Sequence, residues 1–296
     1  MSTSSPPSPL TETSVIVGVG LIGGSLAAAI KQRGLARRVV GVGRSAERLE
    51  AARNAGLIDD LSTNLAEAAR DAQLVIVCTP VDRIVADVRA AAAVMPAGSL
   101  ITDAGSVKGV ICDSLSDLSA GAVTFIGSHP LAGSEKQGFE HACATLFDQR
   151  VCVITPTATT PAEQLRRLHR FWQAVGMQII ELSPADHDVA LARTSHLPHA
   201  VAAALALALS PEHRRFAASG FRDTTRIAAG DPDLWTAIFQ QNTPALIDAI
   251  SLLEQEIAAF KGILQRGNWA SLKNRLQQAK TCHDALNSDS AACGNS

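Results

Sequence analysis

The first half of the chain alternates short apolar runs with segments of helical pattern. Apolar runs of this length, bounded by glycine, proline and small polar residues, are typical of buried strands. They lie at residues 15–19, 38–42, 74–78, 100–102, 124–126, 151–155 and 177–182. Helical patterns occur between several of them, at 25–31, 81–93 and 161–175. This alternation predicts an α/β domain built on one open sheet.

After residue 182 the strand pattern stops, and apolar residues recur at helical spacing. Helices are predicted at 186–209, 217–229, 232–242, 244–267 and 269–286, the first of them interrupted at 195–199. Ala-rich helices as apolar as these are typical of helices buried between subunits. Residues 185–286 are therefore predicted to form an all-α dimerisation and substrate domain, and the protein a homodimer.

The two ends of the chain differ in composition from the rest. Residues 1–13 are rich in serine, threonine and proline and lack the basic start and apolar core of a signal peptide, so a disordered leader is expected there. Residues 287–296 are polar and are expected to form a flexible tail.

Composition narrows the class of protein. The chain has 296 residues, 47% hydrophobic and 18% charged, with a net charge of −2, which is ordinary for a soluble enzyme and gives no support for nucleic-acid or membrane binding. Its six cysteines form no CxxC pair, which argues against a disulfide framework and a thiolate metal site. Scattered thiols fit a reducing compartment, so a cytoplasmic protein without a metal is predicted.

A glycine-rich motif marks the first turn of the α/β domain. An apolar run enters Gly18-Val19-Gly20-Leu21-Ile22-Gly23 and a helical pattern follows, the order that a dinucleotide-binding fold requires. Gly18 permits the tight turn, Gly20 admits a pyrophosphate, and Gly23 lets the helix pack on the strand. Leu21 and Ile22, between these glycines, are also expected to contact the cofactor, and the N–H groups at the start of the helix that follows face the phosphates. The motif predicts a Rossmann-type nucleotide-binding domain over residues 14–184; a tight turn without a ligand is the alternative.

The end of the second predicted strand bears on the choice between NAD and NADP. NAD-binding domains usually carry an acidic residue there to hold the ribose 2′-OH. This chain has Gly43, followed by Arg44 and Ser45, with Arg48 one turn further on. A guanidinium group can pair with a 2′-phosphate, so NADP is the predicted cofactor. A solvated helix start is the alternative, and use of both cofactors stays open.

Polar residues follow three of the predicted strands. Thr79 and Pro80 follow one strand, Ser106 the next, and His129 a third. Ligands of open α/β sheets bind beyond the carboxyl ends of the strands. We therefore expect these residues to converge on a reaction centre, with Thr79 and Pro80 at the cofactor.

The segment 127–136 is predicted to be a loop, because Pro130 and the flanking glycines would interrupt a helix or a strand. A histidine in such a loop can act as a general base near neutral pH, which makes His129 the candidate base. A purely structural histidine is the alternative.

Two polar clusters lie in the helical half. Ser195, His196 and His199 interrupt the first helix pattern. Further on, Arg222 and Arg226 are four residues apart and would share one helix face. A buried arginine needs an anion, which a carboxylate substrate would supply. An intramolecular pair with Asp223 or Asp231 is the alternative.

Five segments together resemble one enzyme family. They are GVGLIGGSLA at 18–27, DAGSVK at 103–108, GSHPLAGSEK at 127–136, SHLPH at 195–199 and GFRDTTRIAAGDPDLW at 220–235. Their residues and their order are similar to those of the prephenate/arogenate (cyclohexadienyl) dehydrogenases of tyrosine biosynthesis. The resemblance runs from about Val15 to Leu286.

The resemblance implies an oxidative decarboxylation. A hydride leaves C4 of a hydroxycyclohexadiene ring for the nicotinamide, the ring carboxylate leaves as CO2, and aromatisation drives the reaction. By this resemblance His129 accepts the hydrogen bond or proton of the C4 hydroxyl. Ser106 would orient His129 and the nicotinamide end of the cofactor.

The resemblance also implies a substrate pocket. Arg226 would bind a substrate carboxylate, assisted by His199 and Ser195. Ser134 and Trp235, the latter reaching across the dimer, would complete the pocket. A dianionic substrate requires donors of this kind.

Alternatives remain open at this point. A β-hydroxy acid dehydrogenase of similar architecture would place a lysine base on the long helix, where this chain has His196 and His199. A non-catalytic NADP-sensing protein would explain the glycine motif alone. Prephenate and arogenate are not distinguished either, because the acidic group that would meet the amine of arogenate could be Asp186, Asp188 or Asp223.

Overall fold

The computed structural model describes residues 9–133 and 136–292, with side chains described as far as Leu286. The chain divides into two compact units, residues 1–243 and 244–296. The first unit contains the sheets and the helices through residue 243, so the division by packing falls well after residue 184. The reason is that helices after residue 184 bond directly to the sheet domain, as shown below for Asp188.

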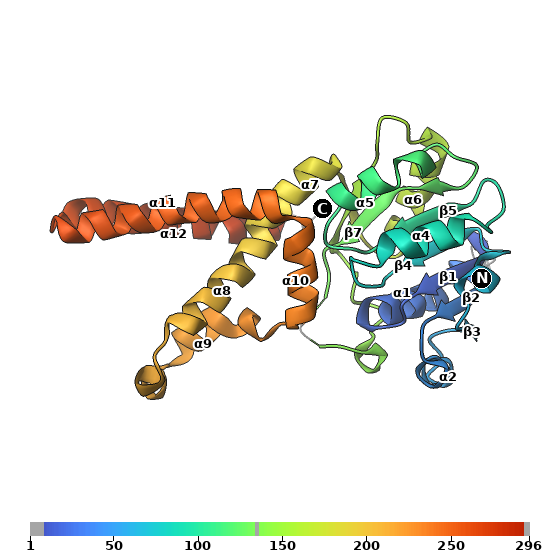
Figure 1. Ribbon diagram of the computed structural model, residues 1–296, viewed down its shortest axis with the longest axis horizontal. Helices are drawn as coiled ribbons and strands as arrows, with labels where there is room; N and C mark the ends of the chain where they lie inside the picture. The colour runs from blue at the N-terminus through green and yellow to red at the C-terminus, as the bar shows by residue number, and fades with distance from the viewer. Residues whose placement is uncertain (1–8, 134–135, 293–296) are drawn as a thin grey trace, which may run out of the picture. The chain divides into compact units, whose positions relative to one another are not determined.

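The first unit is built on a six-stranded parallel sheet with strand order β3-β2-β1-β4-β5-β6 (Figure 1). The strands are β1 (Thr11–Val17), β2 (Ala36–Val42), β3 (Asp60–Ser62), β4 (Leu74–Val77), β5 (Leu100–Asp103) and β6 (Thr124–Phe125). The order reverses between β1 and β4, which is the switch point where ligands of such sheets bind. The predicted Rossmann-type fold is confirmed. The leader prediction is wrong for residues 11–13, because β1 already begins at Thr11.

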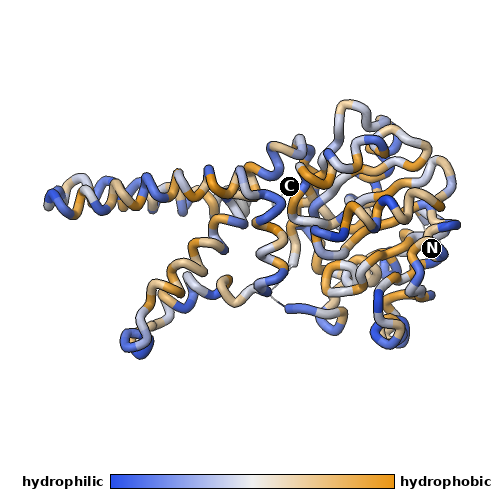
Figure 2. The backbone as a smooth tube through the Cα atoms, viewed as in Figure 1, coloured by the Kyte–Doolittle hydropathy of each residue, from blue (hydrophilic) through white to orange (hydrophobic). Residues whose placement is uncertain are grey.

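Helices cover both faces of this sheet. They are α1 (Leu21–Gln32), α2 (Ala46–Asn54), α3 (Leu65–Ala69), α4 (Ile84–Ala92) and α5 (Gly109–Ser114), with a 3-10 turn η1 (Ser116–Leu118). Strand side chains alternate between two cores, so that Val15 and Val17 pack in one and Ile16 in the other. Strands buried on both faces read as continuous apolar runs, as the hydrophobic colouring of the sheet in Figure 2 shows.

A second sheet corrects the prediction of a single sheet. Its order is β7-β8-β9, with β7 (Gly127–Pro130) antiparallel to β8 (Val151–Thr155) and β8 parallel to β9 (Gln178–Glu181). A 3-10 turn η2 (Phe139–His141) follows β7, and α6 (Ala162–Ala174) joins β8 to β9. His129 therefore lies in a strand, opposite Val153, and not in a loop. Pro130 is tolerated because β7 is an edge strand and Pro130 is its last residue.

The remainder of the first unit is helical. Its elements are α7 (Pro184–Leu191), the π turn η3 (Ala192–His196), α8 (Leu197–Ala208), the 3-10 turn η4 (Pro211–Phe216), α9 (Ser219–Thr225), the 3-10 turn η5 (Arg226–Ala229) and α10 (Pro232–Gln241). The predicted interruption at 195–199 is thus a widened turn within a continuous helical run. Pro198, which has no N–H to donate, is the second residue of α8, which follows this turn.

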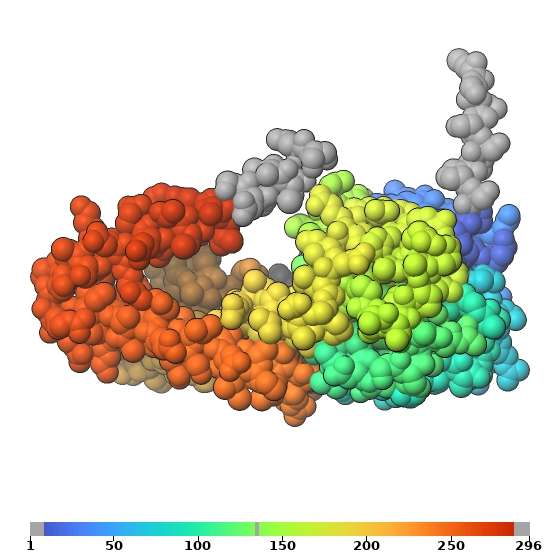
Figure 3. Space-filling view, turned by 90° about the horizontal axis from the view of Figure 1, so that it is seen from above, coloured from blue at the N-terminus to red at the C-terminus, as the bar shows by residue number. Residues whose placement is uncertain are grey.

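The second unit consists of α11 (Thr243–Gln265) and α12 (Trp269–Ala292), drawn in orange and red in Figure 3. Arg275 joins the two helices, because it pairs with Glu256 and lies 5.4 Å over the ring of Phe260. The helix continues to Ala292, so the tail prediction is wrong for residues 287–292. None of the helices in the described residues combines the length and apolarity of a membrane span.

Candidate active site

A buried ion pair organises the end of β5. Asp103 and Lys108 are both fully buried, and the Lys108 ammonium pairs with Oδ2 of Asp103. The same oxygen accepts the N–H of Gly105 at 2.9 Å, and Oδ1 accepts the N–H of Ser128 in β7 at 3.1 Å. A buried ion pair loses the hydration of both charges, and additional hydrogen bonds of this kind compensate for that loss. The pair therefore holds the start of β7, and with it His129, against the end of β5.

Asp188 of α7 binds to the other side of the same segment. Its two carboxylate oxygens accept the backbone N–H groups of Lys108 and Gly109, each at 2.8 Å. A side chain on Gly109 would meet Asp188 at 2.8 Å, so the close approach requires glycine there. Asp188 is thereby fixed beside the sheet edge and is not available to meet the amine of a substrate.

Three side chains form a continuous hydrogen-bonded chain at this edge. Nδ1 of His129 lies 2.9 Å from Nε2 of His187, and Nδ1 of His187 lies 2.8 Å from Oδ1 of Asp188. A carboxylate can only accept, so His187 carries its proton on Nδ1 and its Nε2 is an acceptor. His129 must then carry its own proton on Nδ1. Its Nε2 is left with a free lone pair, which is what a general base requires.

The protonation equilibria support the same assignment. Burial, the neighbouring His187 and then Lys108 hold the pKa of His129 well below its ordinary value of 6.5. Burial also lowers the pKa of His187, although its hydrogen bond to Asp188 acts in the opposite direction. Both imidazoles are therefore neutral at neutral pH.

His187 is a candidate site residue that the sequence analysis missed. Histidine followed by aspartate at 187–188 is visible in the sequence, but nothing in the local pattern links it to His129, 58 residues away. Among the described side chains, His187 is the one that orients His129; no hydrogen bond between Ser106 and His129 occurs there. Ser106 lies half-buried in the segment between Asp103 and Lys108.

The π turn places a second group of polar side chains. The Asn242 amide donates to the carbonyl of Asp188 at 2.8 Å and to Nδ1 of His196 at 3.1 Å. His196 then carries its proton on Nε2, which is buried and meets no partner in the described part of the chain. Burial lowers the pKa of His196 to about 4, so it is a neutral donor. This buried donor is therefore available to a ligand.

The remaining predicted substrate residues lie close to this turn. The rings of His199 and Trp235 stack with centroids 3.4 Å apart, and Trp235 also meets His196 edge to face. The carbonyl oxygen of Ser195 accepts a hydrogen bond from Nδ1 of His199 at 3.1 Å. Arg226 begins η5 and its side chain is exposed. Ser134 lies outside the described residues.

The glycine motif fits a dinucleotide. A Cβ on Gly18, which has a φ of 91°, would lie 2.9 Å from the backbone of Cys78, and one on Gly23 would lie 2.1 Å from the carbonyl oxygen of Gly18. Gly20 has nothing within 4 Å of that position, so the space beside it is open. Leu21 and Ile22 form the first turn of α1, which contains no acidic residue. An anionic pyrophosphate is therefore accommodated there without repulsion.

The predicted contacts at the adenosine ribose are partly engaged within the protein. Ser45 caps α2 by accepting the N–H of Arg48 at 3.2 Å. The Arg48 guanidinium lies 3.8 Å from a carboxylate oxygen of Glu140 in η2. Arg44 is exposed, and no hydrogen bond or ion pair to it occurs among the described residues.

Two further predicted cofactor residues follow β4. The Thr79 hydroxyl donates to Asp87 of α4 at 2.7 Å, and the carbonyl of Pro80 accepts the N–H of Arg83 at 2.9 Å. Both interactions shape the turn between β4 and α4 at the carboxyl edge of the sheet. Thr79 and Pro80 thus lie after the strand, as expected, in a turn held by one side-chain and one backbone hydrogen bond.

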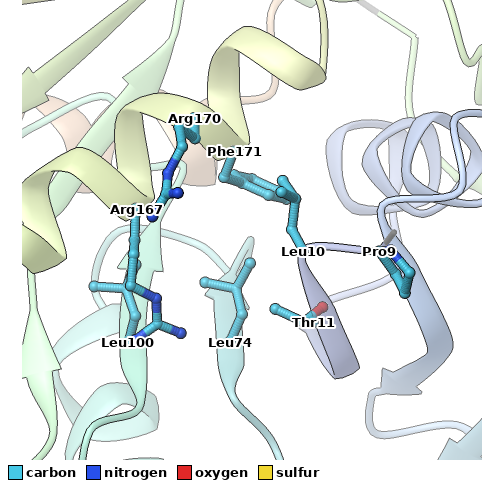
Figure 4. A pocket seen from close by; sticks show the side chains of 8 residues that line it. All are labelled: Pro9, Leu10, Thr11, Leu74, Leu100, Arg167, Arg170 and Phe171. Carbon is cyan, nitrogen blue, oxygen red and sulfur yellow. The ribbon is translucent and has the colours of Figure 1, made fainter. Parts of the chain in front are cut away.

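A cavity at the opposite edge of the sheet is separate from this site (Figure 4). Its walls include Thr11, Leu74 and Leu100, the first residues of β1, β4 and β5. The hydrogen-bonded residues His129, His187 and Asp188 and the glycine motif lie instead at the carboxyl ends of the strands. The cavity therefore takes no part in the site.

A neutral histidine base beside a dinucleotide cradle suits a dehydrogenase that removes a hydride from carbon and a proton from oxygen. Two family models match the chain: the prephenate dehydrogenase nucleotide-binding domain over residues 26–181, and the prephenate dehydrogenase dimerization domain over residues 183–278. The chain belongs to the prephenate dehydrogenase family, and it is an NAD(P)-dependent oxidoreductase.

Individual relatives agree with this assignment. The chain is 32% identical to prephenate dehydrogenase of Bacillus subtilis, over 94% of this chain and 76% of the relative. Prephenate dehydrogenase of Aquifex aeolicus, solved with hydroxyphenyl propionate and NAD+, superposes with a TM-score of 0.87 at 31% identity and covers 93% of this chain and 98% of its own. Synechocystis arogenate dehydrogenase gives 0.81 at 33% identity, with 93% and 99% covered.

The first prediction concerns pH. Because only neutral His129 can accept a proton, and its pKa lies below 6.5, kcat/KM should stay constant as the pH falls from 8 through 6.5 and decline only below it. Replacing His187 by glutamine removes one cause of the low pKa, so the decline should begin at higher pH. The exposed His213, replaced by glutamine, is the control and should not change the profile. A wild-type decline that begins above pH 6.5 would contradict the assignment.

The second prediction concerns the glycine motif. The Cβ of Gly23→Ala would overlap a backbone oxygen, so this variant should lose about 1–3 kcal/mol of unfolding free energy in urea and bind dinucleotide weakly. Gly20→Ala is the matched variant, because its Cβ meets no atom of the protein. It should keep the wild-type urea midpoint and weaken only cofactor binding. Equal midpoints for both variants would show that helix packing does not depend on Gly23.

Proposed function

We propose that the protein catalyses the oxidative decarboxylation of prephenate, of arogenate, or of both, with NADP preferred over NAD. The free Nε2 lone pair of His129, fixed by His187 and Asp188, is the observation that carries this proposal. The family membership favours this reaction over a β-hydroxy acid dehydrogenase and over a non-catalytic NADP sensor.

The reaction balances around the C4 carbon of the substrate. A bound oxidised nicotinamide supplies the acceptor for the C4 hydride. Nε2 of His129 takes the proton of the C4 hydroxyl as the hydride leaves, so that C4 becomes a carbonyl carbon. The bond between the ring and its carboxylate then breaks, its electron pair aromatises the ring and converts the carbonyl into a phenolate, and CO2 leaves. His129 returns the proton to the phenolate oxygen. The protein thus needs one base and donors for the carboxylates.

Those donors lie around the π turn. His199 and Ser195, with Arg226, are the proposed partners of a substrate carboxylate, and the unpartnered Nε2–H of His196 adds a neutral donor. Trp235, stacked on His199, would form an apolar wall beside the ring. Ser134 stays a proposal from the family motif. Because His187 already orients the base, we assign Ser106 to the nicotinamide end of the cofactor.

The proposal also covers the oligomeric state of the protein and its location in the cell. Several apolar side chains of α11 are exposed in the single chain, among them Ile247, Ile257 and Leu264. An apolar face of this kind is typical of a surface that pairs with another subunit. The matching dimerization domain supports a homodimer, and we propose a cytoplasmic protein without membrane or nucleic-acid partners.

The third prediction tests the reaction itself. Initial rates are measured for prephenate and arogenate, each with NAD and NADP, using the wild type and His129→Asn. Turnover is expected for at least one combination, and the variant should lose about 10²–10⁴-fold in kcat while its cofactor Kd stays unchanged. Absence of turnover in all four combinations would refute the proposed function, and full activity of the variant would remove His129 as the base.

The fourth prediction tests the cofactor preference. Arg44 follows β2 and is exposed, so its guanidinium can pair with a 2′-phosphate. Arg44→Ala should weaken NADP binding about tenfold and leave NAD binding within twofold of the wild type. Arg37→Ala, an exposed arginine at the other end of the same strand, is the control. An equal loss for both cofactors would exclude a role for Arg44 at the 2′ position.

A further inference from the structure

The chain lacks an acidic residue at the end of β2 but brings a carboxylate to the same region from elsewhere. Gly43 occupies the usual acidic position, and a Cβ there would meet only Leu49 at ordinary contact distance, 3.4 Å. Space therefore does not forbid a side chain at Gly43. A carboxylate from another element, that of Glu140 in η2, lies 3.8 Å from the guanidinium of Arg48 in α2.

The segment that carries Glu140 is docked against α1. A Cβ on Gly24 would lie 3.3 Å from Cβ of Phe139 and 3.1 Å from that of Ala142. The N–H of Cys143 donates to the Ser25 hydroxyl at 2.9 Å. The 3-10 turn η2 is thus fixed on the second turn of the helix that faces the pyrophosphate.

Gly138 lets Glu140 fold back toward Arg48. It has a φ of 91°, and a Cβ there would lie 2.1 Å from Oε2 of Glu140 and 3.4 Å from Nη2 of Arg48. A side chain at this position would therefore displace the carboxylate from the arginine. Both side chains of the pair are more than half exposed, so a cofactor phosphate can compete for Arg48.

We propose that Glu140 is a specificity-determining residue of the cofactor site, which restrains the preference for NADP by pairing with Arg48 and repelling a 2′-phosphate. The proposal rests on the dinucleotide-dependent function above. A carboxylate beside the adenosine ribose favours a 2′-OH, and an arginine there favours a phosphate. The balance between Glu140 and the two arginines, Arg44 and Arg48, then sets the ratio of the two cofactors.

The fifth prediction measures cofactor binding without turnover. Kd values for NAD and NADP are determined by calorimetric titration of the wild type and Glu140→Gln. The variant should bind NADP about three- to tenfold more tightly, because a screened surface charge contributes an effect of this size, and should bind NAD equally well or more weakly. Raising the salt concentration to 0.5 M should reduce the gain, since the interaction is electrostatic.

Two further variants make the test specific. Glu163→Gln removes an exposed carboxylate that pairs with Arg166 on α6, and it should leave both Kd values unchanged. In an Arg48→Ala background, Glu140→Gln should have at most half of its effect, because the pairing partner is absent. An unchanged NAD-to-NADP ratio in Glu140→Gln would overturn the proposal, as would the same gain in NADP affinity from Glu163→Gln. A wild type that binds neither dinucleotide would instead refute the cofactor assignment itself.

Discussion

The arrangement of the candidate site depends on the buried ion pair between Asp103 and Lys108. Removing one member of such a pair leaves an uncompensated buried charge, at a cost of about 3–5 kcal/mol. Both residues also engage the backbone around them: Asp103 accepts the N–H of Ser128, and the N–H of Lys108 binds Asp188. The strand that carries His129 and the helix that carries His187 are therefore both positioned from one short segment.

The same segment determines the tautomers of the two histidines. Asp188 remains an acceptor because two backbone N–H groups and His187 donate to it. The donor and acceptor in both hydrogen bonds, from His187 to Asp188 and from His129 to His187, follow from this carboxylate. The same holds in other sites where a buried acid fixes an imidazole. The π turn adds a second constraint, since it places His196 in the interior. There Asn242, at the end of α10, donates to His196 and to the carbonyl of Asp188.

The sequence predicts those parts of this architecture that depend on local chemistry. The glycine motif specifies a turn that only glycine can form at Gly18 and Gly23, so strand, turn and helix were all predictable. The second sheet was not predictable, because the sequences of its strands resemble those of the first sheet. The pairing of β7 with β8 depends on tertiary contacts, and Pro130 within β7 makes the segment look like a loop. His187 was missed for the same reason: its partner is distant in sequence, and a histidine inside a helix carries no pattern of its own.

The low pKa of His129 has a chemical consequence for the proposed reaction. A base with a depressed pKa is fully available at neutral pH but binds its proton less strongly. This loss is tolerable where the proton transfer is coupled to a favourable step, and formation of an aromatic ring is such a step. Lys108 lowers the pKa of His129, whereas the carboxylate of Asp188 bonds to His187 and not to His129 itself. The surroundings therefore keep the resting imidazole neutral, and formation of the aromatic ring has to supply the free energy that its protonation requires.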